Sequence, residues 1–185
     1  MKKINVITVD GPSASGKGAL SRSIAHQFRF DILDSGLLYR LYAFLANAKI
    51  NIDEIKEIIL KDVSFIPKED GVVVIFEGNE ITNQLRTEDI AKLASVYSAK
   101  KEVRKLLFDI QRSFYHKKGL VADGRDMGTV VFRDAKLKIF LTASSEIRAK
   151  RRFLELQNRG QEVNMPALIA DIEKRDLKDS SRELS

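Results

Sequence analysis

The chain has 185 residues, of which 44% are hydrophobic and 31% charged, a balance that suits one globular domain with a sizeable core. It contains no cysteine, which excludes disulfides and thiolate metal sites and agrees with a reducing compartment such as the cytoplasm. The net charge of +6 favours anionic ligands but does not distinguish nucleotides from nucleic acid. No apolar run approaches the roughly 20 residues that a membrane span needs, so we expect a cytoplasmic protein without a membrane partner.

The first third of the chain alternates between strand and helix patterns. Residues 4–9 are apolar and β-branched and lead into Asp10, which predicts a buried strand that enters a turn. From Lys17 the apolar residues recur every fourth position, which predicts a helix. A second short strand is expected at 30–33, with a helix after it, and Asn51 is expected to cap the next helix.

Residues 63–90 have a different pattern. Short strand-like pieces at 63–66, 72–76 and 80–81 are separated by glycine-containing turns. We interpret residues 63–90 as a small antiparallel β insert in a core domain formed by residues 1–62 and 91–185.

Helix and strand patterns alternate again in the remainder of the chain. Apolar residues at helical spacing fill 90–114, strands are expected at 119–122 and 137–141, and two further helices follow. Ser144 or Ser145 is expected to cap the first of these helices, and Asn164 the last. Alternating strands and helices predict an α/β fold in which helices flank a parallel sheet of the P-loop NTPase type. Ligands of such folds bind beyond the carboxyl ends of the strands.

The sharpest motif is Gly11–Lys17, which reads G-x-x-x-x-G-K between the first strand and the first helix. Its glycines let backbone N–H groups turn inward, the helix N-terminus adds positive potential, and Lys17 adds a full charge, which together suit ATP phosphates. A glycine-rich turn with an exposed lysine is the alternative interpretation. The predicted ATP-binding residues are Gly11, Pro12, Ser13, Ala14, Ser15, Gly16, Lys17, Gly18 and Ala19.

The motif departs from the general pattern at its end. A Ser or Thr hydroxyl usually follows the lysine and binds Mg²⁺, whereas here Gly18 and Ala19 follow. We therefore expect Mg²⁺, the predicted cofactor, to depend on water and on acids such as Asp34 and Asp123.

Three further polar clusters suit an anionic acceptor. Asp34–Arg40 places Ser35 and Arg40 at a second helix N-terminus, which is a possible anion site. In the run after the third strand, Arg125 could clamp a phosphate and Asp126 could accept from a base amino group. Residues 175–182 place Arg175, Asp179 and Arg182 on one helix face. The alternative interpretations are a capped helix with a surface arginine, a local Arg–Asp pair, and a solvated ion-pair face.

At these residues the sequence resembles the bacterial cytidylate kinases, a family of P-loop nucleoside monophosphate kinases. The resemblance extends over nearly the whole chain and includes a G-K-G ending of the phosphate loop. It rests on Asp10–Pro12, Asp34–Gly36 with Tyr39 and Arg40, Ile81–Thr87, and the long run Asp123–Val131. It implies transfer of the γ-phosphoryl group of ATP to CMP, and also to dCMP, by a monomer that has no stable nucleic-acid partner.

The resemblance also implies a role for each site residue. Ser95, Arg104 and Asp126 would read cytosine, Arg40, Arg125 and Arg182 would hold the acceptor phosphate, Arg175 and Asp179 would face the sugar, and Ser35 would complete the CMP site. Lys17, Arg125 and Arg182 are the expected catalytic residues. A mobile lid at 148–166 would carry Arg148, Arg151, Arg152 and Arg159. The family pattern continues with a final strand and helix, which the sequence ending at Ser185 does not contain.

Three other functions are compatible with a phosphate loop. A small-metabolite kinase of the shikimate or gluconate type phosphorylates a hydroxyl and should not need three arginines around an acceptor phosphate. A nucleotide-operated switch would favour an N-K-x-D motif, which the sequence lacks, and an RNA-binding protein would favour aromatic residues among its basic patches. Only Phe153 accompanies the most basic stretch, Arg148–Arg152.

Overall fold

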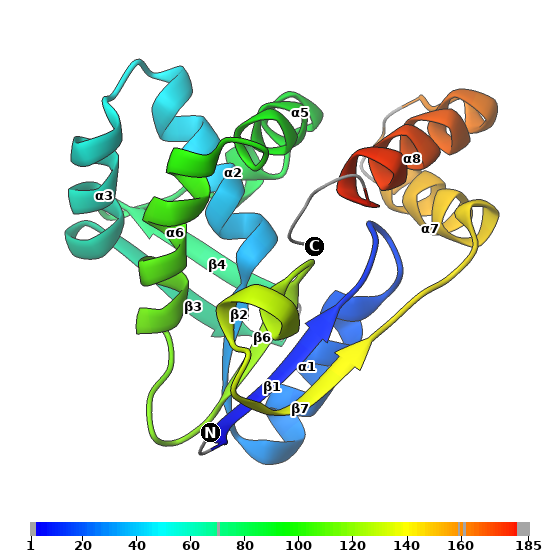
Figure 1. Ribbon diagram of the computed structural model, residues 1–185. Helices are drawn as coiled ribbons and strands as arrows, with labels where there is room; N and C mark the ends of the chain where they lie inside the picture. Colours follow the sequence, from blue (N-terminus) through cyan, green and yellow to red (C-terminus); the bar gives the residue numbers. More distant parts are fainter. Residues whose placement is uncertain (1–2, 70, 159, 161, 181–185) are drawn as a thin grey trace.

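A computed structural model describes residues 3–69, 71–158, 160 and 162–180. Of residues 178–180 it describes the backbone alone. Four of the described strands form a parallel sheet in the order β2–β6–β1–β7 (Figure 1). The strands are β1 (Ile4–Asp10), β2 (Asp31–Asp34), β6 (Leu120–Gly124) and β7 (Ala135–Phe140). The predicted α/β fold with a parallel sheet is therefore confirmed, and each strand lies within three residues of its expected bounds.

Helices flank this sheet on both faces (Figure 1). The helices are α1 (Lys17–Phe28), α2 (Ser35–Asn47), α3 (Ile52–Lys61), α4 (Thr82–Leu85), α5 (Glu88–Tyr97), α6 (Lys101–Ser113), α7 (Ser145–Gln157) and α8 (Met165–Ser180). No helix in the part of the chain that the structure describes is long and apolar enough to cross a membrane.

The predicted helix caps are present. The Asn51 carboxamide oxygen accepts a hydrogen bond from the Glu54 backbone N–H at 2.9 Å, and Asn164 accepts from the N–H of Ala167 at 3.0 Å. Of the two serines considered before α7, Ser144 is the cap. These side chains satisfy backbone donors that the first turn of a helix leaves unpaired, which explains why the helices begin where they do.

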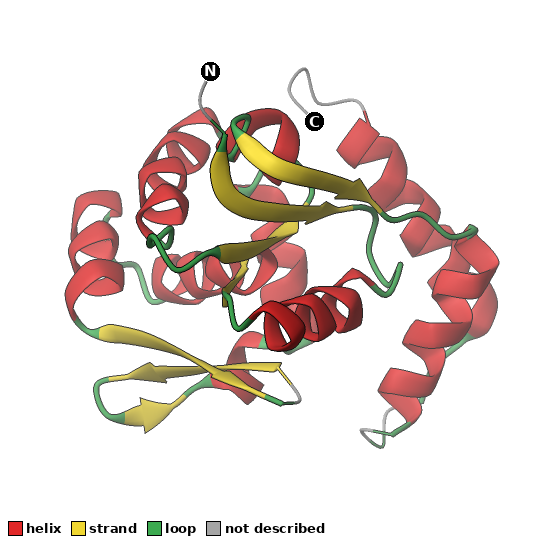
Figure 2. Cartoon of the chain, turned by 90° about the horizontal axis from the view of Figure 1, so that it is seen from below, coloured by secondary structure: helices red, strands yellow, loops and turns green. Residues whose placement is uncertain are grey.

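A second, antiparallel sheet contains β3 (Val63–Lys68), β4 (Gly71–Phe76) and β5 (Asn79–Glu80). Figure 2 shows it separate from the parallel sheet. Val72 and Val74 of β4 are buried in one cluster with Leu38 of α2 and Leu107 of α6. The strands fall within the predicted insert, and its division from the core at residues 63 and 90 stays a prediction.

Two short elements are absent from the sequence-based interpretation. One is α4, and the other is η1 (Met127–Val131), a wide helical turn that follows β6. Both are too short to show a hydrophobic period, and η1 is held by contacts with β1 that are described below.

Candidate functional site

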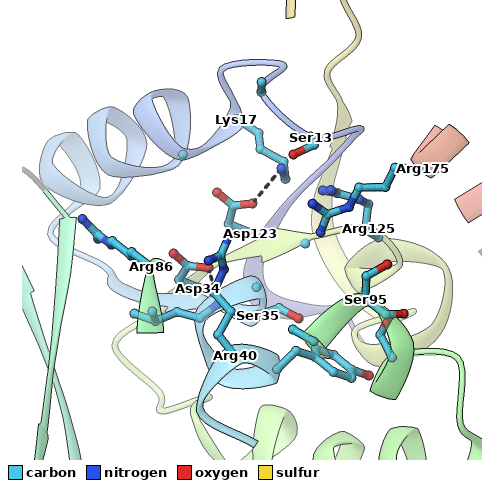
Figure 3. A pocket seen from close by; sticks show the side chains of 18 of the residues that line it. Ser13, Lys17, Asp34, Ser35, Arg40, Arg86, Ser95, Asp123, Arg125 and Arg175 are labelled. Carbon is cyan, nitrogen blue, oxygen red and sulfur yellow. Dashed lines mark hydrogen bonds and ion pairs between the residues drawn. The ribbon is translucent and has the colours of Figure 1, made fainter. Parts of the chain in front are cut away.

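A cavity of about 500 Å³ opens at the carboxyl edge of the parallel sheet. The residues after β1 form one wall of it, and the starts of α2 and of the loop after β6 form another (Figure 3). Because parallel strands all end at the same edge, the polar residues that follow β1, β2 and β6 converge there. This is the place that the fold class predicts for a ligand.

The phosphate loop adopts backbone conformations that suit glycine. Gly16 has a φ of 96°, and a Cβ on Gly11 would lie 2.1 Å from the Leu141 backbone oxygen. Gly16 precedes α1, whose N-terminus therefore faces the loop and favours an anion. The predicted ATP-binding residues that line the cavity are Ser13, Ala14, Gly16, Lys17 and Gly18.

Ala19 lies apart from this group. It is exposed and lines a separate cavity between α1 and the turn of the β3–β4 hairpin. Gly11, Pro12 and Ser15 do not line the cavity at the carboxyl edge of the sheet either, and the ATP-binding role of these four residues stays a prediction.

Lys17 is largely buried at the end of the loop, where α1 begins. Its ammonium donates to the Pro12 backbone oxygen at 3.3 Å and lies 3.9 Å from the Asp123 carboxylate. Burial, and after it the positive charge of Arg125, lowers the pKa of Lys17 to about 8, while Asp123 opposes this shift. A bound anion such as a phosphate would stabilise the charged form of Lys17 and raise its pKa again.

Asp34 and Asp123 are paired neighbours at the ends of β2 and β6. Burial raises the pKa of Asp123 to about 7, with Lys17 opposing the shift and Asp34 adding to it. Asp34 also caps α2, because its carboxylate accepts from the Leu37 N–H at 2.9 Å. Two adjacent carboxylates repel each other, and their hard oxygen ligands fit Mg²⁺.

No third His, Cys, Asp or Glu joins them in a metal-binding cluster within the described residues. Water and the phosphate oxygens of a bound nucleotide would supply the remaining ligands of Mg²⁺, and the dependence on water stays a prediction. The residues present fit a cation that is held partly through water.

The predicted acceptor residues that the structure describes line the same cavity. They are Ser35, Arg40, Ser95, Arg104, Arg125, Asp126 and Arg175. The Arg104 guanidinium donates to the Asp126 carboxylate in a largely buried ion pair. Arg125 donates to the Gly11 backbone oxygen at 2.7 Å, so it connects these predicted acceptor residues, which we call the acceptor wall, with the phosphate loop. Arg182 and the side chain of Asp179 lie outside the described residues.

Two of these residues also have structural partners. The Ser35 hydroxyl accepts from the Gln111 side-chain amide at 2.8 Å, and Arg40 donates to the backbone oxygens of Leu85 at 3.0 Å and Thr87 at 3.4 Å. These bonds orient both side chains before a ligand binds, which lowers the entropy cost of binding.

The expected lid arginines have different surroundings. Arg148 is only 4% exposed, donates to the Ala143 backbone oxygen at 2.9 Å and pairs with Asp176 of α8. Arg151 donates to the Ser15 backbone oxygen at 2.5 Å, and Arg152 lines the cavity. The structure thus gives Arg148 a structural partner in α8, and the lid assignment of the group stays a prediction. Arg159 lies outside the described residues.

The sequence-based interpretation gave no role to several residues at this site. Arg22 and Arg86 both line the cavity. Arg86 lies within the run Ile81–Thr87 that carries the family resemblance, so its type and position were a usable signal. Arg22 is one helical turn beyond Gly18, and only the three-dimensional structure shows which way its helix face points.

A family model and two known relatives indicate the same family. The cytidylate kinase family model matches residues 7–185. The chain is 45% identical over 188 residues to a cytidylate kinase of Proteus mirabilis (strain HI4320), a match that covers 98% of this chain and 83% of that protein. It is 46% identical over 193 residues to a cytidylate kinase of Stutzerimonas stutzeri (strain A1501), with 100% and 84% covered.

Among solved structures, the crystal structure of TT1252 from Thermus thermophilus covers 97% of this chain and 86% of its own. Its TM-score of 0.45 and identity of 15% are too low to bear on fold or function. The family match and the two relatives, by contrast, span nearly the whole chain, including the phosphate loop and the acceptor wall. The chain belongs to the cytidylate kinase family.

Proposed function

We propose that the protein transfers the γ-phosphoryl group of ATP to CMP or dCMP, which yields ADP and CDP or dCDP. The observation that carries this proposal is one cavity with two anion-binding walls. Lys17 and the phosphate loop form the donor wall, and Arg40 and Arg125 lie on the acceptor wall (Figure 3). A kinase that phosphorylates a hydroxyl has no acceptor phosphate for these arginines to bind.

The reaction needs no general base. An oxygen of the CMP phosphate is already an anion; it forms a bond to the γ-phosphorus while the bond to the β–γ bridging oxygen breaks and ADP leaves. The protein therefore has to position the two nucleotides and neutralise charge, which we assign to Lys17, Arg125 and Arg182. Bound Mg²⁺ would neutralise further charge on the ATP phosphates, and Asp34 and Asp123 would hold it through water.

We propose that the acceptor base contacts Asp126, Arg104 and Ser95, and that the sugar contacts Arg175 and Asp179. Support comes from the paired Arg104 and Asp126, which present a donor and an acceptor side by side in the cavity wall. Cytosine offers an amino group next to a ring nitrogen acceptor, which is the complementary pattern.

An ADP-release assay with a panel of acceptors tests the proposed function. We expect CMP and dCMP to give the highest kcat/KM among CMP, dCMP, UMP, AMP, GMP and shikimate. Separation of the products should show CDP formed in a one-to-one ratio with ADP, and a reaction without acceptor measures hydrolysis by water. Faster turnover of shikimate or AMP than of CMP would contradict the proposal.

We also propose that the protein works as a cytoplasmic monomer in pyrimidine nucleotide metabolism. The described residues of one chain supply both walls of the cavity, so the proposed site is complete without a second subunit, and the sequence has no cysteine to stabilise it in an oxidising compartment. Light scattering should give the mass of one chain, and a mass of two chains would contradict the monomer.

A further inference from the structure

The loop after β6 carries two residues of the proposed acceptor wall, and one of them also reaches the phosphate loop. Arg125 donates to the Gly11 backbone oxygen at 2.7 Å, next to the donor phosphates, and Asp126 pairs with Arg104 on the acceptor wall. The two residues are adjacent in the chain, so a shift of this loop would move acceptor contacts relative to the phosphate loop. The loop therefore needs a firm attachment to β1.

Asp10 provides such an attachment. Its carboxylate is 6% exposed and accepts two hydrogen bonds of 2.8 Å, one oxygen from the Met127 N–H and the other from the Gly128 N–H. Asp10 is also the last residue of β1, and its backbone oxygen accepts from the Leu141 N–H at 2.8 Å. One residue thus joins the start of the phosphate loop, the end of β7 and the start of η1.

The fit between η1 and β1 is close. A Cβ on Gly128 would lie 2.7 Å from the Thr8 hydroxyl and 3.3 Å from an Asp10 carboxylate oxygen. The Thr8 hydroxyl is buried and has no hydrogen-bond partner within the described part of the chain. Any larger residue at 128 would therefore push η1 away from β1.

We propose that Asp10 is a positioning residue that sets the distance between the donor and acceptor phosphates. This rests on the proposed function, since it presupposes transfer between two bound nucleotides. Asp10 does not line the cavity on which both nucleotides depend; it holds the segment that carries Arg125 and Asp126 against the strand that leads into the phosphate loop. A misplacement of about 1 Å between reacting groups can cost on the order of 100-fold in rate.

The test compares two variants that disturb opposite ends of η1. In Asp10→Asn the side chain keeps its size. Its amide N–H₂ is a donor that faces one of the two backbone N–H groups, so that hydrogen bond is lost. The control is Asp134→Asn, which removes the carboxylate that pairs with Arg112 at 2.9 Å. Arg112 in turn donates to the backbone oxygen of Val131, the last residue of η1, at 3.0 Å. Both variants remove a carboxylate that supports η1, but only Asp10 attaches η1 to the strand that leads into the phosphate loop.

We expect Asp10→Asn to lower kcat by roughly 100-fold while KM for ATP and for CMP change by no more than about threefold. ATP hydrolysed per CDP formed should rise, because water can replace a misplaced acceptor. Asp134→Asn should lower the melting temperature and leave kcat and this ratio unchanged. An equal loss of kcat in both variants, or an effect of Asp10→Asn on KM alone, would overturn the proposal.

A second pair of variants decides the question if Asp10→Asn does not fold. Gly128→Ala should lower kcat because its methyl group meets the Thr8 hydroxyl. Adding Thr8→Ala removes that hydroxyl and should restore part of the lost kcat. A double variant no faster than Gly128→Ala would count against positioning by this contact. Wild-type protein inactive with every nucleoside monophosphate would instead overturn the proposed function, so the two failures are distinguishable.

Discussion

Single residues at the cavity owe their chemistry to what surrounds them. Lys17 is buried next to both an acid and a guanidinium, and its pKa falls to about 8 because burial outweighs the attraction of Asp123. An isolated lysine would not be perturbed in this way. A lysine whose pKa is lowered in a cavity is a candidate binding-site group, and we expect Lys17 to bind an anion on the phosphate loop.

We therefore expect Lys17→Ala to reduce phosphoryl transfer by at least about 100-fold, because it removes a preorganised charge at the donor phosphates. CMP should still bind, since Lys17 lies on the donor wall. Steady-state kinetics and calorimetric titration with CMP measure the two quantities. Lys61→Ala, which breaks only an exposed pair with Glu57, is the matched control. Undiminished turnover of Lys17→Ala would contradict the donor assignment.

Base selection should depend on Asp126. A carboxylate accepts from the cytosine amino group and is repelled by the uracil carbonyl, at about 1–3 kcal/mol for each unmade bond. CMP should therefore exceed UMP by about tenfold or more in kcat/KM. Asp126→Asn should shrink this ratio, and Ser95→Ala should weaken CMP binding less, because it removes only a neutral hydroxyl.

Asp109→Asn, at an exposed position of α6, is the control for the loss of one negative charge. Kinetics with CMP and UMP measure the ratio for each variant. If Asp126→Asn leaves the ratio unchanged, Asp126 orients Arg104 or Arg125 and does not read the base.

At the scale of elements, α7 and α8 pack side by side, on the opposite side of the phosphate loop from α2 and α5 (Figure 1). Arg148 joins the two helices through its pair with Asp176, and its other donors reach the backbone oxygens of Ala143 and Ser13. A guanidinium can satisfy several acceptors at once in fixed directions, whereas a lysine ammonium cannot match that geometry. Arg148 therefore supports the position of α8, which carries Arg175 into the cavity.

We expect Arg148→Lys to lower the free energy of unfolding by about 1–3 kcal/mol, because buried acceptors lose their partner. Urea unfolding measures it, and Lys150→Arg, an exposed exchange of one cation for another on α7, should have little effect. If Arg148→Lys keeps full stability but loses ATP turnover, Arg148 acts on phosphates as a lid arginine instead.

For the whole molecule, function requires the two walls of the cavity to exclude water around the nucleotides. The segment 148–166 is rich in positive charge, with Lys150, Arg151 and Arg152 in sequence. Arg152 pairs with Glu88 and Glu155, whereas Lys150 and Arg151 are neighbouring positive charges that bound phosphates would neutralise. Closure of this segment over the donor is therefore expected to depend on ligands.

Hydrogen exchange measures this directly. With ATP and CMP together, peptides from 148–166 should exchange more slowly than in the free protein, and more slowly than with CMP alone. Peptides from β1 and β6, in the centre of the sheet, serve as the internal control because their exchange is already slow. Equal exchange of 148–166 with and without both nucleotides would contradict a ligand-dependent lid.

Much of this fold could be predicted from the sequence because its signals are local. The Gly11–Lys17 motif places backbone and charge within seven successive residues, and caps such as Asn51 act over a distance of three residues. Alternation of strands and helices then implied that the strand ends meet at one edge. For this reason the described acceptor residues gather at the same cavity as the phosphate loop.

The sequence by itself thus determined the phosphate loop, the α/β order and the residue types that meet at the cavity. Only the tertiary structure decided which residues Asp10 and Arg148 contact. Asp10 contacts a residue 117 positions away, and Arg148 contacts one 28 positions away, so neither pairing has a local period or motif. Burial also depends on packing from every side, which is why an arginine in a basic stretch can be the most enclosed of its group.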